Sequence, residues 1–398
     1  MGSIDEQHQR TNERDPVVRA WAHRHDLETI RTQAAEAPTG PLSGWTLGVK
    51  DVIDTADLPT ERGSPIYRGR TTSNDAACVA VARRAGAVVV GKTHTTEFAL
   101  FTPTVTTNPH DPDHTPGGSS SGSAAAVADG QVRAAFGTQT VGSVLRPAAY
   151  CGVVGFKPTR GLVPLTGVAT LAWSLDTLGW FTTDVADAQT MLDALTGPTE
   201  APDSRPLRVG RYLSHQWPAA DPATLDILDH ATEALRAAGH SVVDIDPLPH
   251  LAEVFATADT ILHYEIARVF AWEHHNYPEL ISPLVSRMLD RAVSVSGPAY
   301  RTAQRNLLTA CRVHDAYLAS SGIDALLTPS APGEAPDLST TGDSVFNRVW
   351  TALGVPAIHL PAGRGPSGLP MGVQLTGRAW FDADLISTAR QAASALTA

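Results

Sequence analysis

One glycine- and serine-rich segment, residues 116–159, constrains this chain more than any other part: PGGSSSGSAAAVADGQVRAAFGTQTVGSVLRPAAYCGVVGFKPT. It contains Ser119 and Ser143, two serines that stand next to glycines and are 143 − 119 = 24 residues apart. Glycine lets the backbone turn sharply and approach a neighbouring molecule closely. Together with Lys50, upstream in LGVKDVIDT, the two serines have the composition of a nucleophile that is activated by a base other than histidine.

Such a nucleophile requires an uncharged lysine. A serine hydroxyl is a weak nucleophile at neutral pH and needs a partner that accepts its proton. Burial favours the neutral form of a lysine and lowers its pKa. Lys50 lies at the end of an apolar strand, which predicts partial burial, and strand alternation directs the side chain of Asp51 to the other face. Ser119 is then placed to relay a proton from Ser143 to Lys50. The consecutive N–H groups of the turn at 140–143 can form an oxyanion hole, in which losing one donor often costs about 3 kcal/mol.

Other motifs in the chain give weaker indications. Residues 118–122 fit the GxSxG pattern of a nucleophile elbow, but the preceding HDPDHTP cannot be the core strand which that motif needs. Ser119 also precedes a predicted helix, so helix capping is its structural alternative. His110 and His114 are four residues apart, but Pro112 between them prevents a shared helix face. No metal site is expected.

Alternating helix and strand patterns predict a sheet that is buried on both faces. Helices are expected at 75–85, 123–130, 183–195, 222–238 and 382–396, and one amphipathic helix or two short ones between 16 and 37. Strands are expected at 46–54, 87–92, 133–140, 151–161, 324–332, 355–363 and 369–377. Long helices rich in aromatic residues at about 251–318 indicate an insertion that shapes the substrate pocket. We expect one domain over 1–398.

Composition and charge argue against several classes of binding partner and against a membrane or secreted location. A formal charge of −11 and a pI near 5.7 disfavour binding to nucleic acid or to an anionic membrane surface. No apolar run approaches the roughly 20 residues of a membrane helix, and the polar N-terminus is not a signal peptide. Cys78, Cys151 and Cys311 are far apart in the sequence, as in a reducing cytosol. A cytoplasmic location is therefore expected.

These segments resemble the amidase signature family. Its hallmark is a glycine- and serine-rich stretch with two catalytic serines and an upstream lysine in a Gly-Val-Lys-Asp-like segment. The likeness runs from about Leu47 to Arg378 and covers GVKDVIDTADLPTERGSP, GAVVVGKTHTTEFA, NPHDPDHTPGGSSSGSAAAVADG, GTQTVGSVLRPAAYCGVVGFKPTRG, SLDTLGWF, DALLTPSAP, FNRVWTALGVPAIHLPAG and GLPMGVQLTG. It implies an α/β fold with a twisted mixed β-sheet sandwiched between helices (α/β/α), and no metal or organic cofactor.

The resemblance also implies roles by position. Lys50 is similar to the general base of the family, Ser119 to the bridging serine on a cis peptide, and Ser143 to the nucleophile that forms the acyl-enzyme. The oxyanion hole implied by the resemblance consists of the main-chain N–H groups of Thr140, Val141, Gly142 and Ser143.

The chain departs from the family pattern around the nucleophile. The family usually has Asp where this chain has Gln139, Gly where it has Val141, and Arg where it has Leu145; Arg146 follows one position later. An acid–base pair that often braces the turn is therefore expected to be missing or rearranged.

The expected reaction is hydrolysis of a carboxamide, or of a related linear C–N or ester bond, in a small molecule. Three alternatives remain: the glutamine-hydrolysing component of a tRNA-dependent amidotransferase, acyl transfer that forms an amide, and a non-enzymatic binding protein that kept the fold. Trp173, Phe346 and Asp343 are candidate substrate-binding residues because they stand in predicted loops near the cleft. The sequence is also compatible with a homodimer.

Overall fold

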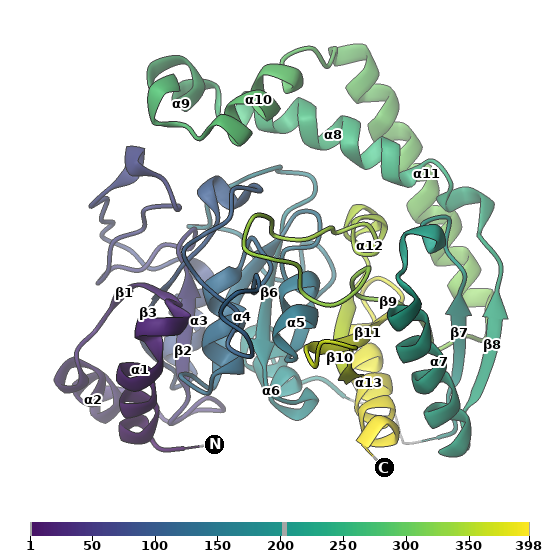
Figure 1. Ribbon diagram of the computed structural model, residues 1–398, viewed down its shortest axis with the longest axis horizontal. Coiled ribbons are helices and arrows are strands. Elements are labelled where there is room, and N and C mark those ends of the chain that lie inside the picture. Colours follow the sequence, from purple (N-terminus) through teal and green to yellow (C-terminus); the bar gives the residue numbers. More distant parts are fainter. Residues whose placement is uncertain (1, 201–204, 398) are drawn as a thin grey trace.

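Eleven strands of the computed structural model, within the described residues 2–200 and 205–397, form one sheet (Figure 1). Their order across the sheet is β1-β3-β2-β4-β6-β5-β10-β11-β9-β7-β8. The strands are β1 (Trp21–Arg24), β2 (Thr46–Lys50), β3 (Val88–Thr93), β4 (Ala134–Gln139), β5 (Val154–Lys157), β6 (Thr177–Thr182), β7 (Arg208–Tyr212), β8 (Ser241–Ile245), β9 (Ala325–Pro329), β10 (Ala357–Arg364) and β11 (Pro370–Thr376). The helices are α1 (Ile4–Val18), α2 (Leu27–Glu36), α3 (Ala77–Arg84), α4 (Ser121–Ala128), α5 (Leu145–Cys151), α6 (Val185–Thr196), α7 (Pro222–Ala237), α8 (Val254–Val269), α9 (Ala271–Asn276), α10 (Pro283–Ala292), α11 (Gly297–Ser321), α12 (Arg348–Leu353) and α13 (Asp382–Thr397).

The sheet is mixed. Strand β2 is parallel to both of its neighbours, β3 and β4, and β7 is parallel to both β8 and β9. The strands between these two parallel groups pair antiparallel, as does the edge strand β1 with β3. The parallel strands β2, β3 and β4 are short and buried along their whole length, as expected where helices cover both faces of a sheet.

Side-chain alternation along the strands gives the sheet a core on each face. In β4, Ala134 and Phe136 belong to one buried cluster and Ala135 to another, because successive strand residues point to opposite faces. Trp180 and Phe181 of β6 divide between the clusters in the same way. Helices α3, α6, α7 and α13 contribute to the first cluster, and α1, α2, α4 and α5 to the second. The expected α/β/α fold is confirmed.

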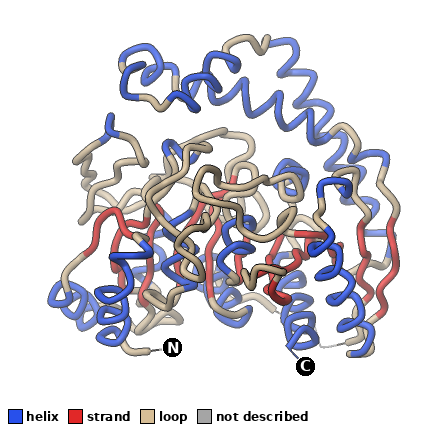
Figure 2. The backbone as a smooth tube through the Cα atoms, in the orientation of Figure 1, coloured by secondary structure: helices blue, strands red, loops and turns tan. Residues whose placement is uncertain are grey.

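Helices α8–α11 form an arm along the side of the molecule opposite the two chain ends (Figure 1). This arm coincides with the predicted helical segment at 251–318. Loops occupy the region between the strands and the arm (Figure 2). Neither the arm nor any other helix in the described ranges is long and apolar enough to cross a membrane.

Hydrogen bonds attach the arm to the rest of the fold at several places, and two of these use the carboxylates of Glu97 and Glu265. The N–H of Ser282, before α10, lies 3.2 Å from each carboxylate oxygen of Glu97. Glu265 of α8 is fully buried and accepts from Ser174 N at 3.0 Å and from Tyr300 Oη at 2.8 Å. Because a buried carboxylate is stable only when its oxygens are satisfied, Glu265 fixes the 171–176 loop to the arm.

The N-terminal region contains a strand that helical spacing did not predict. Two helices are present between 4 and 36, but β1 separates them. Arg19 ends α1 in the left-handed region, at φ 51°, and Trp21 then pairs with Thr93 of β3. The hydrogen-bonding partners of β1 belong to a segment about 70 residues further along the chain, so a local apolar period could not reveal them.

All three lysines of the chain are buried: Lys50, Lys92 and Lys157 are each 0% exposed. Lys92 pairs with Asp51 at 3.3 Å. Lys157 Nζ donates to two main-chain carbonyl oxygens, at 2.5 and 2.9 Å, and burial lowers the pKa of Lys157 to about 7. On the described surface, the basic side chains other than histidine are therefore arginines.

Replacing Trp180 with Ala is expected to lower the free energy of unfolding by about 3–5 kcal/mol. The indole is 0% exposed, packs at a tilt against Phe156 with 5.1 Å between ring centroids, and donates from Nε1 to Ala188 O at 3.2 Å. The matched control is Trp272→Ala in the arm, where the indole is 53% exposed and the expected loss is under about 1 kcal/mol. Urea unfolding measures both; equal losses would contradict the assignment of Trp180 to the core.

Candidate active site

Two parallel strands place Lys50 beside the serine-rich segment. Lys50 is the last residue of β2, and the parallel neighbouring strand β4 ends at Gln139, so both strands end at the same edge of the sheet. Lys50 Nζ donates to Ser119 Oγ at 2.7 Å and to Thr138 Oγ1 at 2.8 Å. Lys50 and Ser119 are both 0% exposed. The structure therefore brings the predicted base and bridging serine into direct contact.

The surroundings of Lys50 favour its uncharged form. Burial lowers the pKa of Lys50 well below its usual value of 10.5; the nearby carboxylate of Asp176 opposes this shift, and Arg146 adds to it. In the described part of the chain no carboxylate forms an ion pair with Lys50. Asp51 is turned away and pairs with Lys92, as strand alternation predicted.

The backbone of Ser119 is held from two sides. The Gly118–Ser119 peptide bond is cis, as the family resemblance implied. Arg146 Nη2 donates to Gly118 O at 2.6 Å, and Thr96 N donates to Ser119 O at 3.2 Å. The residue at the N-cap of α4 is Ser120, without a side-chain capping bond. The Ser119 hydroxyl therefore serves the lysine rather than the helix.

The turn between β4 and α5 carries Ser143, which is 8% exposed. Within residues 2–200 and 205–397, the main-chain N–H groups of Val141, Gly142 and Ser143 meet no protein acceptor. The Ser143 hydroxyl also has no hydrogen bond to another described residue, Ser119 included. The turn thus presents free donors and a free hydroxyl together.

Asp176 is a buried carboxylate beside this turn that was not among the predicted site residues. Its Oδ1 accepts from Thr140 Oγ1 at 2.5 Å, and its Oδ2 accepts from Leu171 N at 2.8 Å and Ala172 N at 3.1 Å. Burial raises the pKa of Asp176 to about 6, and these hydrogen bonds oppose the rise. The only signal in the sequence was its place in the family-like segment SLDTLGWF.

The acid–base pair that often supports this turn in the family is absent here. The uncharged Gln139 contacts the turn, and Arg146 has unpaired nitrogens. Gln139 Oε1 accepts from the N–H groups of Val144 at 2.8 Å and Leu145 at 3.0 Å. Arg146 is 1% exposed, and its Nε and Nη1 have no hydrogen-bond partner in the described structure. Burial lowers the pKa of Arg146 to about 10. The contacts around the turn are therefore rearranged, as the departures in the sequence predicted.

The two aromatic candidates for substrate binding differ in accessibility. Trp173 is 49% exposed, and its ring centroid lies 6.4 Å from that of Tyr300, so it faces the arm. Phe346 is 4% exposed and, with Trp350, lines a cavity of only about 10 Å³. Such a cavity holds at most about one water molecule. The role of Trp173 in substrate binding remains a prediction, and Phe346 contributes mainly to packing.

Asp343 stands at a cavity of about 450 Å³ that adjoins the nucleophile turn. Arg348 and Ser344 also line this cavity. A Cβ on Gly142 would lie 2.6 Å from Ser344 Cβ, so the wall of the cavity touches the turn. A carboxylate and a guanidinium at one opening suit a polar substrate, and Asp343 stays a candidate for contacting it.

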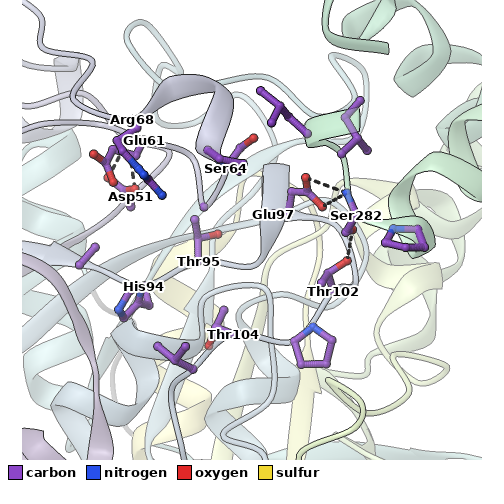
Figure 3. Close-up of a pocket in the computed structure, with 18 of the residues that line it drawn as sticks. Asp51, Glu61, Ser64, Arg68, His94, Thr95, Glu97, Thr102, Thr104 and Ser282 are labelled. Carbon is purple, nitrogen blue, oxygen red and sulfur yellow. Dashed lines mark hydrogen bonds between the residues drawn. The ribbon is translucent and has the colours of Figure 1, made fainter. Parts of the chain in front are cut away.

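A second cavity, of about 770 Å³, lies between the loops near the end of β3 and the arm (Figure 3). Figure 3 shows the hydrogen bonds between Glu97 and Ser282 at one side of this cavity, and Asp51 at another side. Thr95 lines this cavity, and its neighbour Thr96 holds the carbonyl of Ser119. One loop therefore contacts the arm and the bridging serine. In the described residues, no group of three or more His, Cys, Asp or Glu side chains has metal-binding geometry.

The geometry agrees with the comparison to known proteins. The chain matches the family described as Amidase over residues 3–386, and it therefore belongs to the amidase signature family, whose members act on C–N bonds.

Relatives within this family differ in their named activities. The chain is 32% identical to a glutamyl-tRNA(Gln) amidotransferase subunit from Chloroflexus aurantiacus over 440 residues, which cover 95% of this chain and 89% of the relative. The structure of peptide amidase from Stenotrophomonas maltophilia superposes with a TM-score of 0.83, 29% identity, and coverage of 99% and 93%. 6-Aminohexanoate cyclic dimer hydrolase gives a TM-score of 0.87 at 26% identity, with coverage of 99% and 93%.

An uncharged Lys50 has a consequence for stability that needs no substrate. Below pH 10.5 the unfolded chain binds a proton at Lys50 that the folded chain lacks, so this residue destabilises the fold less as pH rises. As the pH rises from just above the lowered pKa to 10.5, the parent should gain about 1.4 kcal/mol of unfolding free energy per pH unit from this group. Lys50→Met lacks the group and should not show this gain. Urea unfolding of both proteins between about pH 7 and 9.5 measures this difference. A pH-independent difference would mean that folded Lys50 is charged.

Proposed function

We propose that this protein hydrolyses the carboxamide, or a related C–N or ester bond, of a small molecule through an acyl-enzyme on Ser143. The single observation that carries the proposal is the contact between Lys50 Nζ and Ser119 Oγ at 2.7 Å, deep in the protein and without a carboxylate partner among the described residues. A neutral amine in this position can accept a proton.

The proposed proton transfers run from Ser143 through Ser119 to Lys50. Ser143 Oγ attacks the carbonyl carbon, its proton moves to Ser119 Oγ, and the proton of Ser119 moves to Lys50 Nζ. The N–H groups of the 140–143 turn stabilise the oxyanion. Lys50 Nζ then returns its proton to Ser119 Oγ, and Ser119 passes its own proton to the leaving nitrogen as the C–N bond breaks. In the second half, water attacks the acyl carbon and gives a proton to the relay, and Ser143 Oγ takes a proton from Ser119 as the acyl bond breaks. Rotation of the Ser143 side chain toward Ser119 closes the relay when substrate binds.

A second candidate function is the hydrolysis of glutamine for a tRNA-dependent amidotransferase. It is supported by the relatives, since the Chloroflexus aurantiacus amidotransferase sequence matches 95% of this chain. The cavity beside Asp343 and Arg348 could bind a substrate that carries both charges. Both candidates use the same acyl-enzyme chemistry and differ in substrate and in partners.

Ser143→Ala is expected to lower the turnover of primary carboxamides by at least about 10³-fold, because the attacking oxygen is removed. A fluorophosphonate probe, read by mass spectrometry of the peptide that contains residue 143, should label the parent and not Ser143→Ala. Ser121→Ala is the matched control: its hydroxyl donates to Gly117 O within the same segment, and the variant should be labelled normally. Parental turnover by Ser143→Ala would refute the acyl-enzyme.

The two candidate functions are separated by substrate range. For the small-molecule amidase, we expect ammonia release from carboxamides of graded acyl size, with glutamine turned over at less than about a tenth of the rate of the best amide. Coupled glutamate dehydrogenase detects ammonia from both. Glutamine as the best substrate, together with co-purification of further protein chains from the source cells, would favour the amidotransferase assignment instead.

A further inference from the structure

The nucleophile turn is held at both ends by one uncharged side chain. Gln139 is 0% exposed and ends β4, directly before the turn. Its Oε1 accepts from Val144 N and Leu145 N, beyond Ser143, at 2.8 and 3.0 Å. Two acceptor bonds use both lone pairs of the amide oxygen. The C-terminal end of the turn is thereby fixed to the strand that precedes it.

The amide nitrogen of Gln139 connects to the other end of the turn through Thr351. Gln139 Nε2 donates to Thr351 Oγ1 at 2.8 Å. The Thr351 hydroxyl has two acceptors within reach, Val141 O at 3.1 Å and Asn347 O in its own helix at 3.3 Å, and the shorter distance is to the turn. Thr351 is 0% exposed, so water does not compete for these bonds.

The remaining contacts of the turn leave its donors free. Thr140 is held by Asp176, and Gly142 is pressed against the segment before α12, where a Cβ would lie 2.7 Å from Asn347 Oδ1. Every one of these contacts uses side chains or carbonyl oxygens of the turn. Within the described chain, the N–H groups of residues 141–143 therefore stay unpaired and share one fixed arrangement.

We propose that Gln139 and Thr351 are positioning residues: they form an uncharged clamp that holds the nucleophile turn in the shape required for oxyanion stabilisation. This inference rests on the proposed function of Ser143. It assigns a task to two residues that contact neither the substrate nor the reacting atoms. The clamp acts on the rate of acylation rather than on the affinity for the substrate.

The test compares Thr351→Val with Thr351→Ser, using inactivation by a fluorophosphonate probe. Valine keeps the shape and removes the hydroxyl, so the maximal inactivation rate should fall about tenfold or more, with the probe concentration at half-maximal rate unchanged within about twofold. Serine restores the hydroxyl, and its rate should return to within about threefold of the parent. Both variants are assayed well below their unfolding midpoints, measured in parallel.

A second variant tests the clamp from its other side. Gln139→Glu keeps the acceptors for Val144 and Leu145, but its carboxylate cannot donate to Thr351. We expect the maximal inactivation rate at neutral pH to fall, because the bond that connects the clamp to Thr351 is lost. This variant serves on its own if Thr351→Val does not fold.

The outcomes separate the clamp from the proposed function. Labelling of the parent at Ser143, with slow inactivation of Thr351→Val and Gln139→Glu and a near-normal rate for Thr351→Ser, supports the clamp. A parental inactivation rate in Thr351→Val or in Gln139→Glu overturns the clamp and leaves the acyl-enzyme intact. Failure of the folded parent to label at Ser143 overturns the proposed function, and the clamp with it.

Discussion

The buried amine of Lys50 sets the conditions for the groups around it. A charged ammonium at a fully buried position without an ion-pair partner would cost several kcal/mol, and burial accordingly lowers the pKa of Lys50. Two neighbouring charges act on this pKa in opposite directions: the carboxylate of Asp176 raises it, and the guanidinium of Arg146 lowers it. The protonation state of the amine therefore depends on the balance between burial and these two side chains.

The relative position of the lysine and the nucleophile turn depends on the sheet. Lys50 and Gln139 end neighbouring parallel strands, and main-chain ladder bonds determine the spacing between strands. The arm does not pair with these strands and does not set this spacing. Helices α8–α11 can therefore change without altering the distance between Lys50 and the turn.

The parts of the site that were predicted before the structure are those encoded in local patterns. Lys50, Ser119 and Ser143 were recognisable from their glycine-rich segments, and the strands around them from apolar runs. Thr351 was not, because it meets Gln139 across 212 residues of chain and its segment carries no catalytic pattern.

Several fold elements were missed for related reasons. Helix α5 is only one to two turns long and contains Pro147, so it shows little helical period. Strand β1 is defined by its pairing with β3 rather than by its own composition. Phe346, a candidate from its loop position, is buried, and its contact with substrate stays a prediction.

The burial of all three lysines has a practical consequence. Acylating reagents selective for amines find no lysine on the described surface of the native protein, so acylation at these positions reports transient opening of the core, residue by residue.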